Sequence, residues 1–247
     1  MEKVNILGVP INKISMANAV EVLNSFLNED KFHFVATPNA EFVMIAQKDE
    51  GYMKILNSTD LNVPDGIGIV FASKVFKEPI KERVAGFDLM IEFIKSIDQK
   101  NINSPNIYLL GAAPGVAEEA KAKLEKQYPA VNIVGVHDGY FNDTDDEAII
   151  KDINSKNTDI LFVALGAPKQ EKWIFKNKGK LKVKIAMGVG GSFDVLAGRV
   201  ERAPLIFRKL GAEWLYRLIK EPWRYKRMAV LPKFVLKVIF TKKKVML

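Results

Sequence analysis

Short apolar runs alternate with amphipathic segments along residues 1–198. Apolar residues at helical spacing predict helices at 17–27, 116–128 and 144–154. Between them lie six apolar runs with the length of buried strands: 32–36, 61–63, 107–110, 133–136, 160–165 and 183–187. This alternation is typical of an α/β fold, with a Rossmann-like, mostly parallel sheet that carries helices on both faces. We expect one domain with this fold over residues 1–198.

A shorter region follows from residue 199 to residue 247. Within 203–227 apolar side chains recur at helical spacing, and Pro222 is expected to end that helix before a second apolar segment at 228–240. The region holds fourteen Lys or Arg residues against three Glu, a net charge of +11, so the total of +8 leaves −3 for residues 1–198. We therefore predict a basic, helical C-terminal appendage on a mildly acidic body.

The composition of the appendage favours an anionic membrane surface as its partner. Helices with an apolar face and a cationic face lie in the membrane interface, and each basic residue near anionic lipid adds about 1 kcal/mol of attraction. Alternatively, the appendage packs on the body or on a sister subunit, and homo-oligomers are expected because exposed apolar surface needs covering. Nucleic acid is not expected as a partner, because the aliphatic content is high for a surface that follows phosphates.

Other features of the sequence point to the cytoplasm. The absence of cysteine excludes disulfides and cysteine-bound zinc. The N-terminus lacks the basic start and long apolar run of a signal peptide, and no segment reaches the roughly 18 apolar residues of a spanning helix. We expect a cytoplasmic protein that binds peripherally to the inner face of the cell membrane.

Polar residues follow the predicted strands, at the edge where parallel sheets bind their ligands. Thr37 and Asn39 come directly after the first run, either as ligand-binding groups or as the cap of the next helix. Asp65 lies between Pro64 and Gly66 after the second run, where it could serve as a general base or only form an Asx turn. Both interpretations stay open for each segment.

Further candidates lie at the later strand ends. Arg83 precedes a predicted helix and is either a surface residue or a group that binds a phosphate or sugar oxygen through two hydrogen bonds. Tyr140 and Gln170 follow the fourth and fifth runs and could line a shared cleft. A glycine-rich turn follows the last run, and its N–H groups and carboxylate suit a phosphate and a ribose or base: Gly190, Gly191 and Asp194.

Two cofactor patterns occur in the sequence, one of them only in part. Residues 143–145 read Asp-Thr-Asp, a metal-binding pattern of many sugar-nucleotide transferases, but acids here suit the first turn of a helix. Residues 111–115 partly match a dinucleotide fingerprint whose third glycine is missing. With two histidines and no cysteine, a transition-metal site is also not expected. We therefore expect no metal and no cofactor.

Read together, these loops resemble the WecG/TagA/CpsF glycosyltransferase family. The segments that carry the resemblance are TPNAE, PDGIG, ERVAGFD, HDGYF, LGAPKQEKW and GVGGSFD. In the appendage, the pattern R-x-x-x-A-P-x-x-x-x-x-x-G-x-E-W-x-x-R-x-x-x-E-P-x-R from Arg199 to Arg224 adds to it. The resemblance implies a metal-independent, inverting enzyme that transfers a sugar from a UDP donor to N-acetylglucosamine on undecaprenyl diphosphate. Within the family, the chain most resembles members that use UDP-N-acetylmannosamine and form the β-1,4 bond of the wall teichoic acid linkage unit.

The resemblance also implies roles for the candidate residues. Asp65 would take the proton of the acceptor 4-hydroxyl, while Asp194 and the glycines before it would hold the uridine end of the donor. The residues that would bind substrate around Asp65 are Thr37, Asn39, Arg83 and Gln170. The arginines of the appendage that would cover the diphosphate are Arg217, Arg224 and Arg227.

Three alternatives to this function are carried forward. The first is the same reaction with another donor, UDP-N-acetylmannosaminuronic acid or UDP-glucose. The second is a membrane-associated module that binds a nucleotide without catalysis, in which Asp65 is only a turn residue. The third is a dehydrogenase, for which the partial fingerprint at 111–115 gives weak support.

Overall fold

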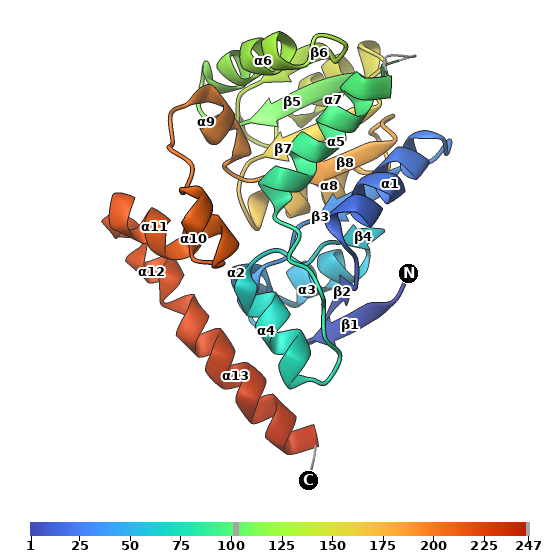
Figure 1. Cartoon of the computed structure of the whole chain (residues 1–247). Coiled ribbons are helices and arrows are strands. Elements are labelled where there is room, and N and C mark those ends of the chain that lie inside the picture. Colours follow the sequence, from blue (N-terminus) through green and yellow to red (C-terminus); the bar gives the residue numbers. More distant parts are fainter. Residues whose placement is uncertain (101–103, 246–247) are drawn as a thin grey trace.

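The computed structural model describes the backbone of residues 1–100 and 104–245 (Figure 1). The described side chains exclude Lys100, Lys209, Arg224, Lys226, Arg227 and residues 242–245. Six parallel strands form the central sheet in the order β4-β3-β8-β7-β5-β6. Their bounds are β3 (His33–Ala36), β4 (Leu61–Asn62), β5 (Asn106–Gly111), β6 (Asn132–His137), β7 (Ile160–Ala164) and β8 (Ile185–Gly188). The predicted α/β fold is confirmed, and each strand overlaps a predicted run.

Helices cover both faces of this sheet, as the sequence predicted. Along β3, Phe34 and Ala36 belong to one apolar core while Val35 belongs to the other, because side chains alternate between the faces of a strand. The helices that pack on the first core are α2 (Ala40–Ala46), α3 (Glu50–Asn57), α4 (Ile67–Val75), α7 (Asp146–Ser155) and α8 (Lys169–Asn177). The second core receives α1 (Met16–Leu27), α5 (Gly86–Lys100), α6 (Val116–Gln127) and α9 (Ser192–Ala197).

A two-stranded antiparallel hairpin precedes the sheet and was not predicted. Its strands β1 (Lys3–Ile6) and β2 (Val9–Asn12) are joined by Leu7 and Gly8, which have φ angles of 52° and 91°. Two consecutive residues with positive φ give the tight turn that suits a hairpin. The hairpin is tied to the sheet by Asn12, whose Oδ1 accepts a hydrogen bond of 2.9 Å from the backbone N–H of Asn62.

The appendage is helical, but the prediction of one continuous helix from residue 203 up to Pro222 was wrong. The chain forms α10 (Leu205–Lys209) and α11 (Glu213–Lys220), separated at Gly211, whose φ of 68° ends α10. A Cβ at Gly211 would lie 3.0 Å from the Cβ of Ile67, so the turn sits directly on the body. The predicted stop before Pro222 is confirmed, since α11 ends at Lys220 and a 3-10 turn, η1 (Pro222–Arg224), follows.

The last two helices are α12 (Tyr225–Met228) and α13 (Val230–Val245), and α13 lies along α2 and α4 (Figure 1). Phe234 and Val238, one turn apart, are fully buried against the body. For this face of α13, the alternative that the appendage packs on the body is therefore confirmed. The other face exposes large apolar residues, and within 1–100 and 104–245 no helix combines the length and apolarity that crossing a membrane requires.

Ion pairs attach the start of the appendage to the body. Arg199 makes two hydrogen bonds, of 3.0 and 2.6 Å, to the carboxylate of Glu119 on α6. Arg202 pairs with Asp88 on α5 and lies over the ring of Phe87, with its guanidinium carbon 4.5 Å from the ring centroid. The path from α9 to α10 is thus held at two points on the second-core face of the sheet.

Candidate active site

The loops that follow the strands meet at the carboxyl edge of the sheet. The neighbouring strands β3 and β8 are followed by α2 and α9, which pack on opposite faces. A crevice for ligands forms at such a point in open α/β sheets. The loop after β4, which carries Asp65, lies next to this point because β4 is the other neighbour of β3.

Hydrogen bonds to two other segments of the chain hold Asp65 in place. Its backbone N–H donates to the carbonyl of Pro38, at 3.2 Å, which links the loops after β3 and β4. Its carboxylate accepts a hydrogen bond from the backbone N–H of Gly86, at the start of α5. Burial raises the pKa of Asp65 to about 6, against the lowering effects of Arg83, the Gly86 N–H and Arg217. The carboxylate is therefore ionised at neutral pH and more basic than an ordinary aspartate.

Thr37 packs against Gly86, the same residue that bonds to Asp65. A Cβ at Gly86 would lie 3.0 Å from both Oγ1 and Cγ2 of Thr37, so a larger residue there would displace one of the two loops. Thr37 is 7% exposed. The structure thus brings Thr37 and Asp65 together through the start of α5, as expected for two residues of one site.

Asn39 caps helix α2. Its Oδ1 accepts hydrogen bonds from the backbone N–H groups of Glu41 and Phe42, at 2.9 and 3.3 Å. The helix-cap interpretation of this residue is confirmed, which leaves the amide Nδ2 as the group that can meet a substrate. Asn39 also adjoins the Asp65 loop, since a Cβ at Gly66 would be 3.6 Å from its Cβ.

Arg83 connects the site to the appendage. Its Nη1 pairs with Glu213 of α11 at 2.7 Å, and its Nη2 donates to the carbonyl of Arg208 at 3.3 Å. Both side chains of the ion pair are about four fifths buried, with exposures of 20% and 19%. Arg217 lies one turn beyond Glu213 on α11, and the charges of both act on Asp65 in opposite directions. The structure therefore places α11 beside the candidate base.

Gln170 lies inside the protein and bridges two loops. It is 1% exposed, and its Oε1 accepts hydrogen bonds from the backbone N–H groups of Gly166, at 3.2 Å, and Gly190, at 3.0 Å. Its Nε2 donates to Glu171 at 2.6 Å. Its amide oxygen and nitrogen thus have hydrogen-bond partners within the chain, and the oxygen holds the turns after β7 and β8 together. Glu171 is fully buried and was missed, because a glutamate in a helical segment is ordinarily exposed.

Asp194 and Tyr140 lie at different distances from Asp65. Asp194 is in the first turn of α9, and its Oδ2 is 3.6 Å from the position of a Cβ on Gly191. It follows β8, two strands from β4, or about 10 Å along the sheet. Tyr140 follows β6 at the far edge, about 24 Å from β4, and its side chain is 77% exposed. Two further predicted residues, Arg224 and Arg227, have side chains outside the described part of the chain.

The segment with the Asp-Thr-Asp pattern forms the turn that leads into α7, and Asp145 is the residue at the helix cap. Asp143 pairs with Lys176 at 3.3 Å, and Asp146, in the first turn of α7, accepts a hydrogen bond of 2.7 Å from Trp173. Over residues 1–100 and 104–245, no three His, Asp or Glu side chains are grouped so that they could hold a metal ion. The carboxylates of this segment therefore have partners within the chain.

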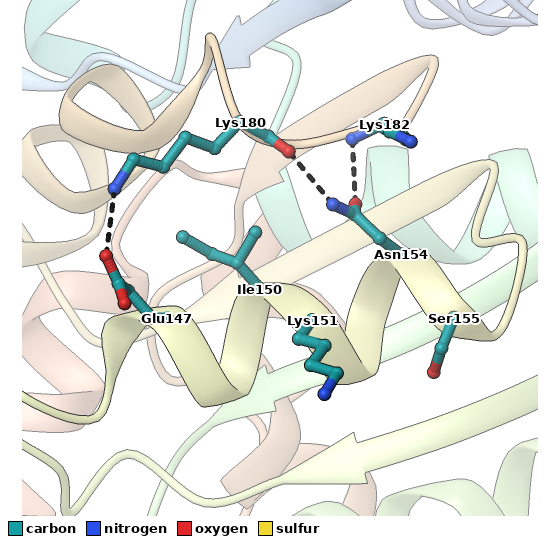
Figure 2. Close-up of a pocket in the computed structure, with 7 residues that line it drawn as sticks. All are labelled: Glu147, Ile150, Lys151, Asn154, Ser155, Lys180 and Lys182. Carbon is teal, nitrogen blue, oxygen red and sulfur yellow. Dashed lines mark hydrogen bonds and ion pairs between the residues drawn. The ribbon is translucent and has the colours of Figure 1, made fainter.

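A surface depression of about 570 Å³ lies away from the carboxyl ends of the strands, beside the segments that lead into β7 and β8 (Figure 2). It is formed by α7 and the segment before β8, where Asn154 bonds to the backbone of Lys180 and Lys182. Its remaining charged side chains are Glu147 and Lys151. This basic depression is separate from the loops that hold Asp65. The molecule therefore has a second basic region besides the appendage.

The fold and this edge define an α/β protein with a half-buried, hydrogen-bonded carboxylate and flanking arginines at the crevice of a doubly wound sheet. The chain belongs to the glycosyl transferase WecG/TagA/CpsF family, whose model matches residues 4–246. Two relatives, from Staphylococcus aureus strains MRSA252 and MW2, are named N-acetylglucosaminyldiphosphoundecaprenol N-acetyl-beta-D-mannosaminyltransferase. Each is 37% identical over 245 residues, which are 98% of this chain and 94% of the relative. The expected family is confirmed, and the protein is a glycosyltransferase.

Proposed function

We propose that the protein transfers N-acetylmannosamine from UDP-N-acetylmannosamine to the 4-hydroxyl of N-acetylglucosamine on undecaprenyl diphosphate. The bond formed is β-1,4, as in the wall teichoic acid linkage unit. The acceptor and the sugar follow the names of the relatives, which align with nearly the whole chain. The observation that carries the proposal is Asp65, a carboxylate with its pKa raised to about 6 beside Arg83 and Arg217.

The reaction is a single displacement that inverts the anomeric carbon. Asp65 takes the proton of the acceptor hydroxyl as its oxygen forms a bond to C1 of the donor sugar. The bond between C1 and the diphosphate oxygen breaks, and UDP leaves with the electron pair. Arg83 and Arg217, whose charges act on Asp65, stabilise the negative charge that develops on UDP and supply the positive charge without a metal ion.

The donor lies across the loops after β3 and β8. The backbone N–H groups of Gly190 and Gly191 bind the diphosphate, as glycine turns before a helix commonly do. Asp194 accepts hydrogen bonds from the uridine end, and Asn39 donates to the substrate through Nδ2. Arg224 and Arg227, which follow α11, complete the cover over the diphosphate.

The appendage binds the membrane surface in which the acceptor lipid is anchored. Exposed apolar residues accompany its basic side chains, an arrangement that suits the boundary of an anionic bilayer. They include Leu205, Ile206, Leu210, Ile219 and Trp223, each more than 60% exposed. In solution the same residues favour self-association, because large exposed apolar patches tend to be covered. We place the protein on the inner face of the cell membrane, peripherally bound.

The configuration of the product tests this proposal. The purified protein is incubated with UDP-N-acetylmannosamine and a short-chain diphosphate-linked N-acetylglucosamine acceptor in EDTA, and the product is examined by NMR. We expect a β-linked N-acetylmannosamine on O4. An α-linked product would contradict the inverting displacement. UDP binding with no product would favour another donor sugar, which parallel reactions with UDP-glucose and UDP-N-acetylmannosaminuronic acid would reveal.

A further inference from the structure

A fully buried glutamate lies behind the glycine turns of the candidate site. Glu171 is on α8, is 0% exposed and contacts two polar side chains. Its Oε2 accepts a hydrogen bond of 3.0 Å from the hydroxyl of Tyr52 on α3, and its Oε1 accepts one of 2.6 Å from Nε2 of Gln170. Tyr52 is also fully buried. Burying a carboxylate is costly, so such a group is retained where its hydrogen bonds serve a purpose.

These contacts determine which way the Gln170 amide points. Its Oε1 accepts from the N–H groups of Gly166 and Gly190, which belong to the turns after β7 and β8. A reversed amide would bring Nε2 against two N–H donors and Oε1 against the carboxylate of Glu171, so three compatible contacts would become repulsive. Glu171 therefore enforces the orientation in which one oxygen joins the two turns.

The end of β8 is shaped to admit this pair. A Cβ at Gly188 would lie 2.6 Å from Nε2 of Gln170 and 2.8 Å from Oε1 of Glu171. Only glycine leaves room for both side chains next to the strand. The network thus occupies space directly beneath the turn that contains Gly190 and Gly191.

We propose that Glu171 is a positioning residue for the donor nucleotide, acting through Gln170 to hold the turns after β7 and β8 at the spacing that binds UDP. The inference rests on the proposed function, because that function places the diphosphate on Gly190 and Gly191. Tyr52 supports Glu171 from the far side. Burial and the neighbouring Glu171 raise the pKa of Tyr52, which keeps its hydroxyl protonated and able to donate.

The state of the carboxyl is consistent with this role. Burial raises the pKa of Glu171 to about 7, while the hydrogen bonds from Gln170 and Tyr52 lower it. What the network needs is an acceptor at Oε1, which an amide in place of the carboxylate also supplies. The Gln substitution therefore keeps the acceptor, whereas a Met substitution of similar length removes it.

Direct binding of UDP, measured by calorimetry on the full chain, tests the proposal. Glu171→Met should weaken UDP binding at least tenfold and raise the KM for the donor, with the KM for the acceptor unchanged. Glu171→Gln should restore most of the affinity, and Tyr52→Phe should have an intermediate effect. Ile174→Ala serves as the control, because it opens a cavity in the core on the same helix without touching the amide.

Thermal unfolding of each variant separates positioning from general loosening. We expect Ile174→Ala to lower the melting temperature and to keep the wild-type affinity for UDP. The proposal is overturned if Glu171→Met binds UDP like the wild type, if Ile174→Ala weakens binding equally, or if Glu171→Gln loses as much affinity as Glu171→Met. If wild-type protein binds UDP but transfers no N-acetylmannosamine, the proposed donor fails while the binding comparison still tests Glu171.

Discussion

The body and the appendage of this protein use apolar side chains in opposite ways. Among the described residues, the large exposed apolar side chains of the body are Met1, Ile67, Phe71 and Tyr140. The described part of the shorter appendage has eleven: Leu205, Ile206, Leu210, Trp214, Leu215, Ile219, Trp223, Tyr225, Leu236, Ile239 and Phe240. The body also has a net charge of −3 and the appendage one of +11. The body thus buries most of its large apolar side chains in its own core, whereas the appendage exposes an apolar and basic surface that suits a membrane interface.

The two regions meet at the candidate base. Asp65 belongs to the body, and Glu213 and Arg217 belong to α11 of the appendage, yet the charges of both act on the pKa of Asp65. The Arg83–Glu213 ion pair joins the regions at 2.7 Å across a sequence separation of 130 residues. The difference teaches that the part proposed to meet the membrane also lies beside Asp65, so we expect docking and catalysis to share residues of α11.

Among changes that test the contrast between body and appendage, the largest effect is expected from charges placed in the exposed face of the appendage. Ile206→Glu together with Leu210→Glu should weaken binding to anionic vesicles at least thirtyfold, because burying each side chain contributes about 1.5–3 kcal/mol. The control is Lys151→Gln with Lys182→Gln, an equal charge change in the depression of Figure 2. Vesicle sedimentation should show the control bound like the wild type. Equal losses in both variants would mean that binding follows total charge and not the appendage.

A smaller effect is expected from closing the contact beneath Asp65. Gly86→Ala places a Cβ 3.0 Å from the side chain of Thr37 and should displace the N–H that bonds to Asp65. We expect kcat to fall about tenfold, since misplacement of a catalytic group by a fraction of an ångström is costly. Gly179→Ala is the matched control, because a Cβ there meets nothing within 4 Å. Steady-state kinetics that show Gly86→Ala as active as Gly179→Ala would exclude this role for Gly86.

The smallest effect is a shift in the pH dependence. Because Asp65 must be ionised to accept a proton, kcat/KM should fall as the pH drops through about 6. Glu213 raises the pKa of Asp65 and Arg217 lowers it. Glu213→Gln should therefore move the acid limb to lower pH, and Arg217→Gln should move it to higher pH, each by about half a unit or a threefold change in rate at low pH. An acid limb that stays in place in both variants would show that α11 does not lie beside Asp65 in solution.

The sequence predicted the sheet well because its strands are buried on both faces and read as continuous apolar runs. The hairpin of β1 and β2 escaped prediction because each strand has only four residues and the signal of so short a segment is weak. The break at Gly211 was also missed, since the apolar spacing continues across it while the local contact with Ile67 is visible only in three dimensions.

The candidate site was predicted in part. The position of Asp65 after a strand was enough to mark it, but its bond to Gly86 and its nearness to Arg217 depend on contacts between distant segments. Gln170 was chosen as a residue that binds substrate, and the structure gives it partners within the chain. No local pattern could show that Glu171 is buried, because its environment is set by the packing of α3 against α8.

The most direct test of the account is acceptor-dependent UDP release from UDP-N-acetylmannosamine in EDTA, comparing the wild type with Asp65→Asn. Asparagine keeps the shape of the side chain but cannot take the proton, and loss of a general base costs about 10²–10⁴ in rate. The account predicts release by the wild type that survives EDTA and falls at least a hundredfold in Asp65→Asn. Equal rates in the two proteins would contradict the role of Asp65, and loss of wild-type release in EDTA would contradict metal independence.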